Sequence, residues 1–286
     1  MTPSQFADFW RIQGHRVIET ASCFWYNAQL LSFLSLPYHR TIWPAASELG
    51  QVFRRGPAAV VRFFIDDPGQ GDQGLFVRTE RDYDFSSLEK KARNQTRRGL
   101  EKCAVEQLDF AYVAREGHAI NTDTFVRQGR AANTFTETQW HRYCQAAAAT
   151  PDLEAWGAFV EGQLAAFMVT ALVEDCYNIL HQASRTSTLA SYPNNALTFT
   201  VTSRELSRTE VGFISYGLKS LEDTSSLDHF KLQMGYRLQP RSDRVVLNAL
   251  LKPFTRLGGR RLVHWMAQRP NSSDFWRKAS RVLLKQ

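Results

Sequence analysis

The chain has 286 residues, of which 43% are hydrophobic and 12% aromatic, so it carries ample apolar material for a packed core and is not a disordered protein. Its formal net charge of +7 favours an anionic partner, such as a nucleotide-bearing cofactor, tRNA or an anionic membrane surface. A chain of this length is large enough for two domains.

Several classes of protein are excluded by what the sequence lacks. No run approaches the roughly 20 apolar residues that cross a bilayer, and the opening MTPSQFADFWRIQGHR lacks the apolar segment of a signal peptide, so we expect a cytoplasmic protein. The four cysteines are widely spaced and form no CxxC pair, so we expect reduced thiols and no metal site. The common nucleotide-loop, kinase, zinc-protease and serine-hydrolase motifs are missing as well.

In the first 80 residues, segments with a strand pattern alternate with segments with a turn pattern. His15–Tyr26 and Ala58–Ile65 are apolar and β-branched enough to be buried strands, and Leu75–Arg78 reads as the return strand of a hairpin. The intervening loop contains a formal G-x-G-x-x-G at 69–74, but this leads into a strand and not into a helix. We therefore expect a hairpin tip there and not a phosphate-binding loop.

Residues 86–103 form the clearest helix in the sequence. Ser86 and Glu89 have the spacing of a capping box, and small or apolar residues recur on one face. The opposite face gathers six cations, with Glu101 as the only nearby carboxylate: Lys90, Lys91, Arg93, Arg97, Arg98 and Lys102. Such a face is either an ordinary solvated surface or a binding surface for an anion.

The middle of the chain shows alternation at Val105–Ala114, which indicates a strand, and a weak helical pattern at Asn121–Asn133 interrupted by Gly129. Thr136–Ala149 is a helix with Thr136 and Gln139 as its capping box.

From Leu153 onward the sequence is typical of an antiparallel meander followed by a further strand and helix. The predicted strands are Ala155–Val160, Leu164–Leu172, Cys176–Gln182 and Gly212–Tyr216, and the helix is Ser225–Met234. The connecting segment Tyr192–Ser207 suits a strand by alternation and a helix by spacing, so the pattern leaves both open.

The last part of the chain is basic and interrupted by glycines. A tail helix that docks on the body is one interpretation, and a peripheral contact with a membrane surface is the other, because aromatic and aliphatic residues alternate there with Lys and Arg. We divide the chain into an N-terminal half at 1–115, a C-terminal half at 116–245 and a basic tail at 246–286.

Three stretches of this sequence resemble GNAT-type acyltransferases, and within them the Fem-type peptidyl transferases and related acetyltransferase-like proteins. They are KKARNQTRRGLEKC, then NILHQASRTS followed by YPNNALTF, and ISYGLKSLEDTSSLDHFKLQMGY. The resemblance implies an α/β (α+β) fold, a mixed sheet flanked by helices in two related GNAT-like halves. It also implies direct acyl transfer from a donor to an amine or hydroxyl, without a covalent enzyme intermediate.

In such a fold a V-shaped split between two parallel strands receives the donor, which here places it between Tyr177–Gln182 and Gly212–Tyr216. The next helix would point its N-terminus at donor phosphates. Users of acetyl-coenzyme A carry a glycine-rich turn before that helix, whereas Arg185–Asn195 has no glycine. The resemblance thus implies an acyl-coenzyme A or, as in Fem-type relatives, an aminoacyl-tRNA as the donor, and a small molecule or cell-envelope precursor as the acceptor.

Direct transfer needs a polarised carbonyl, a proton acceptor for the amine and an anchor for donor phosphates. Backbone N–H groups near His181–Ala183 are the candidates for polarising the carbonyl. The candidate catalytic side chains are His181, Tyr216 and Tyr236, with a buried core histidine as the alternative interpretation of His181. The resemblance implies that Lys231, in an F-K motif, contacts substrate phosphate, and the remaining candidate donor-binding residues are Arg185, Asn194, Asn195, Lys219 and Ser220.

Two hypotheses from other classes compete with the acyltransferase. One is a nucleic-acid-binding module that uses the cationic helix face. The other is a degenerate GNAT scaffold that binds an anionic partner or a membrane surface.

Overall fold

A computed structural model describes residues 1–29, 31–66, 73–131, 134–219, 225–251, 265 and 268. The chain forms two compact units that interleave in sequence. Unit one comprises residues 1–14 and 74–240, and unit two comprises residues 15–73 and 241–286. Each unit is described separately below.

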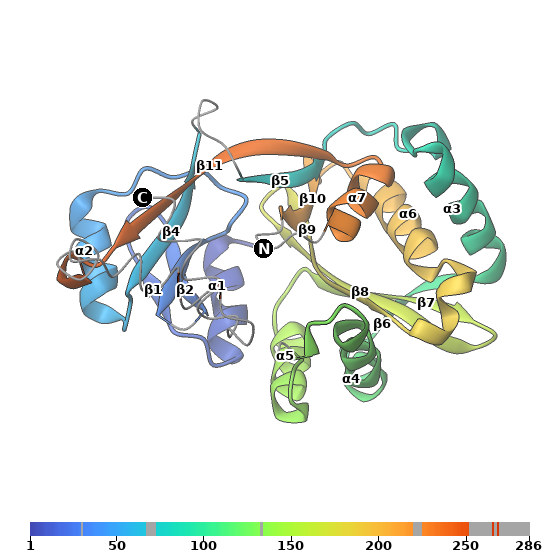
Figure 1. Cartoon of the computed structure of the whole chain (residues 1–286), viewed down its shortest axis with the longest axis horizontal. Coiled ribbons are helices and arrows are strands. Elements are labelled where there is room, and N and C mark those ends of the chain that lie inside the picture. The colour runs from blue at the N-terminus through green and yellow to red at the C-terminus, as the bar shows by residue number, and fades with distance from the viewer. Residues whose placement is uncertain are drawn as a thin grey trace. The chain divides into compact units, whose positions relative to one another are not determined.

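In unit one, six strands follow one another in the order β5-β10-β9-β8-β7-β6, and residues 237–240 of β11 lie next to β5 (Figure 1). Neighbouring strands in this six-stranded part of the sheet pair antiparallel except β9 and β10, which run parallel. The strands are β5 (Gln73–Arg78), β6 (Ala104–Leu108), β7 (Leu153–Val160), β8 (Gln163–Val173), β9 (Cys176–Ser184) and β10 (Phe213–Leu218).

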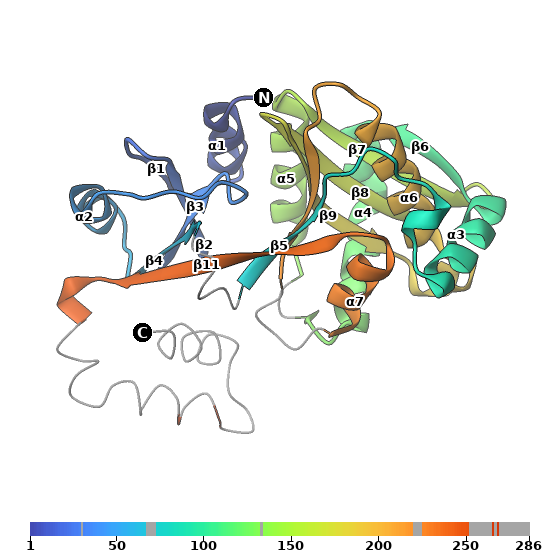
Figure 2. The same cartoon turned by 90° about the horizontal axis from the view of Figure 1, so that it is seen from above.

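Helices cover both faces of this sheet (Figures 1 and 2). On one face α6 packs on the strands and α3 packs on α6, and on the other face α4 and α5 pack on the strands and α1 on α5. The helices are α1 (Pro3–Ile12), α3 (Lys90–Lys102), α4 (Phe110–Arg127), α5 (Glu137–Ala149), α6 (Pro193–Leu206) and α7 (Ser225–Gln233).

The burial pattern of the central strand β8 fits a sheet that is covered on both faces. All its residues except Gln163 are buried, so it reads as a continuous apolar run and not as an alternation. On one face Met168 joins a core with Leu197 and Val201 of α6. On the other face Phe167 meets the Trp140 ring of α5 edge-on, with ring centroids 5.6 Å apart.

Unit two contains the sheet β1-β2-β3-β4-β11, in which only β3 and β4 run parallel, and helix α2 contributes to its core (Figure 2). Trp25, Phe33 and Val61 from the strands are fully buried together with Val52 from α2. The elements are β1 (Val17–Glu19), β2 (Phe24–Gln29), β3 (Ser32–Leu36), α2 (Ala46–Arg55), β4 (Val60–Ile65) and β11 (Arg237–Leu247), of which residues 241–247 belong to this unit.

Most predicted strands and helices are confirmed, but the predicted hairpin of residues 58–78 is wrong. β4 pairs with β3 and β11, whereas β5 pairs with β10 in the other unit. Predicted strand Val105–Ala114 ends early, because Asp109 accepts a hydrogen bond from the Tyr112 amide and starts α4. The predicted capping box at Ser86 is also wrong, since a 3-10 turn precedes α3 and Glu89 is its N-cap. The segment that the pattern left open is the helix α6.

The units do not follow the predicted division of the chain. The chain passes from one unit to the other after residues 14, 73 and 240, and the predicted boundary at 115 falls inside α4. The division into related halves stays a prediction. Residues 69–72 of the glycine-rich loop lie outside the described residues, as does almost all of the basic tail with its predicted membrane contact. Among the described residues, no helix is both long and apolar enough to span a bilayer.

Candidate acyl-transfer site

Strands β9 and β10 part after a short parallel ladder. They pair only from Phe213 and Cys176 to Ser215 and Asn178. Beyond this point each strand carries a bulge: Leu180 is the extra residue where β9 pairs with β8, and β10 shifts its register on β5 between Ser215 and Leu218. Because bulges bend and twist a strand, both strands turn away from each other. The predicted split is therefore present.

Gly217 lies at the bulge of β10 and explains the local geometry. Its φ is +75°, a region that residues with a Cβ rarely adopt, and no atom lies within 4 Å of where a Cβ would be. Glycine is therefore required here by the backbone conformation and not by crowding.

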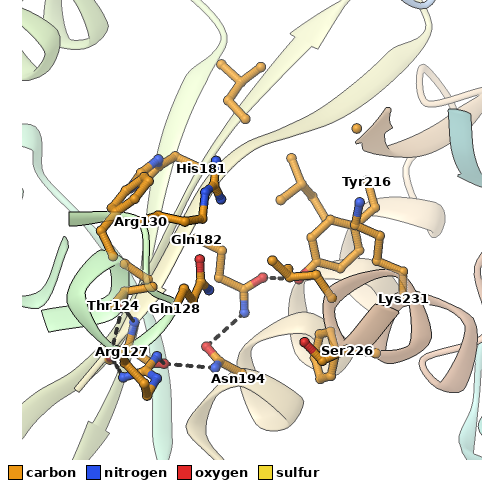
Figure 3. A pocket seen from close by; sticks show the side chains of 18 residues that line it. Thr124, Arg127, Gln128, Arg130, His181, Gln182, Asn194, Tyr216, Ser226 and Lys231 are labelled. Atoms are coloured by element: carbon orange, nitrogen blue, oxygen red, sulfur yellow. Dashed lines mark hydrogen bonds between the residues drawn. The ribbon is translucent and has the colours of Figure 1, made fainter. Parts of the chain in front are cut away.

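A cavity of about 460 Å³ lies at this split (Figure 3). One wall comes from β9 and the end of α4, the other from β10 and α7, and Asn194 of α6 closes one side. Among the described residues that line it are three cations, Arg127, Arg130 and Lys231, and no carboxylate. The cavity is therefore suited to a ligand that carries negative charge.

Side chains bridge the split where backbone pairing has stopped. The Tyr216 hydroxyl on β10 donates a hydrogen bond to the Gln182 amide oxygen on β9. Gln182 Nε2 donates to Asn194 Oδ1 at 3.1 Å, and Asn194 Nδ2 donates to Ser184 Oγ at 2.9 Å. This chain of hydrogen bonds, visible in Figure 3, fixes the Tyr216 hydroxyl relative to β9 and to the first turn of α6.

Lys231 of α7 is buried in the wall of the cavity. Its Nζ lies 4.5 Å from the centre of the Phe76 ring and 3.3 Å from the Leu218 carbonyl oxygen, and Asp228 lies 3.5 Å away. Burial lowers the pKa of Lys231, and Asp228 acts in the opposite direction. The ammonium group of Lys231 therefore lies at the cavity, but Asp228 and the Leu218 carbonyl already interact with its charge.

Arg127 and Arg130 lie where α4 ends. Arg127 donates to the Ser184 carbonyl at 3.0 Å and to the Thr186 hydroxyl at 2.7 Å, so it ties α4 to the end of β9. Arg130 follows Gly129, whose φ is +68°. Its amide donates to the Phe125 carbonyl at 2.8 Å, and the Gly129 amide donates to the carbonyl of Val126. This is a Schellman motif, and it turns Arg130 back toward the helix and the cavity.

His181 lines the cavity within a group of aromatic rings. The ring centroids nearest to it belong to Phe125, Phe135, Trp140, Tyr143 and Phe167, at 5.6 to 6.4 Å. Burial lowers the pKa of His181 to about 4, with a further contribution from the charge of Arg130. The imidazole is thus neutral at pH 7, and its Nε2 is covered from solvent without a hydrogen-bond partner among the described residues.

Four of the nine predicted site residues lie together at the cavity: His181, Tyr216, Asn194 and Lys231. Tyr236 does not reach it; its buried hydroxyl bonds to Thr202, and burial raises its pKa far above the usual value. Asn195 is buried against the Met234 sulfur, and Arg185 donates through Nε to the Leu164 carbonyl. Neither lines the cavity, and neither does the exposed Lys219. Ser220 lies outside the described residues.

Three further residues that line the cavity are not among the predicted site residues: Gln182, Arg127 and Arg130. Gln182 lies inside the stretch NILHQASRTS that carried the resemblance, so its position beside His181 was a usable signal. Arg130 follows a glycine at the end of a helical pattern, which is the signature of a Schellman cap, but the helix boundaries were misassigned. In the part of the chain that the structure describes, no three His, Cys, Asp or Glu side chains gather as metal ligands.

Comparison with known proteins finds structures with a similar fold but no relative that is similar in sequence. No protein-family model matches the sequence, and no curated protein matches it. Among solved structures, FemX has a TM-score of 0.63 at 11% identity, covering 89% of this chain and 93% of its own. The C-terminal domain of a putative lysylphosphatidylglycerol synthetase from Agrobacterium fabrum has a TM-score of 0.57 at 12% identity, covering 90% and 92%. The chain therefore has a GNAT/Fem-like fold, a mixed sheet flanked by helices.

Proposed function

We propose that this protein is an acyltransferase and that transfer takes place in the cavity between β9 and β10. The observation that carries the proposal is the parting of two parallel strands over a cavity whose described lining residues include three cations and no carboxylate. The likeness of fold to FemX and to the C-terminal domain of a putative lysylphosphatidylglycerol synthetase agrees with the proposal at the level of the superfamily.

The opened strand edge supplies the polarising groups. All six residues from Ile179 to Ser184 line the cavity, and on the β10 side this stretch of β9 has no strand partner among the described residues. Since successive backbone amides point to opposite sides of a strand, part of this edge directs N–H groups into the cavity. Such fixed donors can bind the carbonyl oxygen of a donor thioester or ester as it gains negative charge.

The side chains of the cavity are better suited as hydrogen-bond donors than as bases. His181 has a pKa of about 4, too low to hold an amine proton near pH 7. Burial raises the pKa of Tyr216, so its phenol stays protonated and would act on a leaving sulfur or oxygen as a hydrogen-bond donor, with its one O–H turning there from Gln182. We therefore assign Tyr216, oriented by Gln182, to the leaving group, and infer that the acceptor enters as a free amine or loses its proton to water.

The donor we propose is an acyl-coenzyme A or an aminoacyl-tRNA, and the acceptor a small molecule or cell-envelope precursor in the cytoplasm. Phosphate groups would lie near Lys231 and the first turn of α6, where Asn194 lines the cavity. The absence of glycine between Arg185 and Asn195 favours phosphate contacts through side chains over contacts through bare backbone.

Donor binding and transfer test this proposal directly. The full chain is titrated with acetyl-coenzyme A, a long-chain acyl-coenzyme A and aminoacyl-tRNA while its melting temperature is followed, since a ligand of the folded state raises that temperature. We expect one donor to stabilise the wild type and Lys219→Met, and to stabilise Lys231→Met much less. Lys219 is the matched control because it is exposed and outside the cavity. Mass spectrometry then detects acyl transfer to a panel of amines. The proposal is contradicted if no donor raises the melting temperature, or if every donor raises it equally in Lys219→Met and Lys231→Met.

The cationic face of α3 supports a second candidate function, binding of RNA or DNA. Five of its six cations are exposed: Lys90, Lys91, Arg97, Arg98 and Lys102. Arg93 is half-buried and donates to the Leu88 carbonyl at 3.0 Å, so we assign it a structural role and not a part in this surface. A one-sided row of exposed cations binds phosphates without reading sequence.

Salt dependence tests this candidate. Binding to a labelled tRNA is measured between low and physiological salt for the wild type and for Arg97→Glu/Arg98→Glu, with Lys219→Glu as a control that reverses one charge outside this face. Binding that weakens steeply with salt and is lost in the double variant supports it. Binding that is absent, or equal in both variants, removes it.

A further inference from the structure

Arg130 is the cation of the cavity whose charge the protein itself leaves unmatched. Lys231 lies near Asp228 and a backbone carbonyl, and Arg127 is engaged by Ser184 and Thr186. The Arg130 guanidinium makes no ion pair or hydrogen bond with the described residues, and its Nε is covered from solvent without a partner. A buried donor without an acceptor destabilises the fold, so a ligand that supplies the acceptor gains this energy on binding.

His181 supplies a second unmatched nitrogen on the same wall (Figure 3). Its Nε2 is also covered and without a partner, and the charge of Arg130 is near enough to act on the imidazole. The guanidinium contains only donors, so the partner it lacks must be an acceptor. A neutral imidazole can add a donor beside it, and the Phe125 ring lies under the guanidinium at 5.2 Å.

We propose that Arg130 and His181 form a subsite for a carboxylate group of the transferred acyl unit or of the acceptor. One unmatched charge and a planar fork fit a monovalent, planar carboxylate. A phosphate dianion would bring excess negative charge into a wall made largely of aromatic rings, which is costly away from water. The substrate class that follows is an amino acid, peptide or dicarboxylate, and this assignment rests on the proposed acyl-transfer cavity.

The test uses the full chain with isotope-labelled histidines and follows the ¹⁵N signal of His181 at pH 7, identified by its loss in His181→Gln. Acetate and inorganic pyrophosphate are added separately at matched ionic strength, with sodium chloride as the blank. Three variants are compared with the wild type: Arg130→Met, which keeps an unbranched apolar stem but removes the charge, Arg130→Lys, which keeps the charge, and Arg98→Met as an exposed control.

We expect acetate to shift the His181 signal saturably in the wild type and in Arg98→Met. Arg130→Met should weaken that response by about tenfold or more, the effect expected for a charged hydrogen bond, and Arg130→Lys should fall between. Arg130→Met should also change the His181 signal without any anion, because the charge beside it is gone. The signals of the other six histidines should stay unchanged, which shows that the variant is folded and that the change at His181 reports the interaction of the two residues.

Three results would overturn the assignment: no response to acetate, a response that Arg130→Met retains in full, or a response to pyrophosphate alone. Failure of this subsite is distinguishable from failure of the acyltransferase proposal. If acetate binds through Arg130 while no acyl donor stabilises the protein, the subsite stands and the transferase does not. If a donor binds and transfers while acetate leaves His181 unchanged, the reverse holds.

Discussion

The glycine at the bulge of β10 offers a sharp test of whether the split is functional. Gly217 and Gly162, the latter in the turn between β7 and β8, have nearly the same φ, +75° and +77°, and neither has an atom within 4 Å of an added Cβ. Alanine at either position meets no clash but is strained by about 1–2 kcal/mol in this backbone region. Both variants should therefore lose similar stability, of about 1 kcal/mol after the reduced entropy of the unfolded chain is counted.

Only one of the two should lose ligand binding, because Gly217 lines the cavity and Gly162 does not. If the backbone of Gly217→Ala moves to relieve the strain, donor binding must return it to the original conformation. This costs about 1–2 kcal/mol of the free energy of binding. The apparent affinity then falls about 5- to 30-fold. Urea unfolding gives the stabilities, and titration with the stabilising donor gives the affinities. Equal affinities in the two variants, at equal stabilities, would refute the inference that this bulge shapes the binding site.

Three further predictions test the packing and the electrostatics. Arg62→Met should lower the free energy of unfolding by about 3–5 kcal/mol, because it leaves the 1%-exposed Asp243 without the guanidinium that lies 2.7 Å away; urea unfolding that shows less than 1 kcal/mol contradicts this. Gly99→Ala should cost about 1–3 kcal/mol, since a Cβ would lie 2.8 Å from the Tyr192 carbonyl where α3 meets α6; a melting temperature at or above the wild-type value argues against that packing. The folded pKa of His181, about 4, lies below its unfolded value of 6.5, so the unfolded state binds more protons and stability falls as the pH drops from 6.5 toward 4; His181→Gln should flatten that slope in urea unfolding at pH 7 and pH 5, and an unchanged slope refutes the assignment.

Local sequence predicted the strands and helices of unit one well where periodicity and turn chemistry agree. The meander β7 to β9 has long apolar runs separated by Glu161-Gly162 and Glu174-Asp175, and residues 161, 162 and 174 all have positive φ. The start of α5 was equally clear, since Thr136 and Gln139 form the capping box that their spacing predicted.

Partnerships between distant segments could not be predicted in the same way. Nothing in Val60–Ile65 indicates that its partner is Ser242–Leu247, so the hairpin to the nearest downstream strand was the natural prediction and was wrong. The site shows the same limit. The parting of β9 and β10 came from a family resemblance, but whether Lys231 or Arg130 keeps an unmatched charge depends on Asp228 and on a helix cap, which only the folded chain brings together.

The pairing of β4 with β11 has a consequence for how the protein is made. Val60 faces Leu247, so unit two cannot complete its sheet until nearly the whole described chain has left the ribosome. Contacts so distant in sequence form slowly, and until then one edge of β4 offers unpaired backbone groups to other chains. A chain truncated before Arg237 would lose β11, which leaves β4 in unit two without this neighbour and removes residues 237–240 from the edge of β5 in unit one. We expect such a chain to aggregate during synthesis even if its transfer site can form.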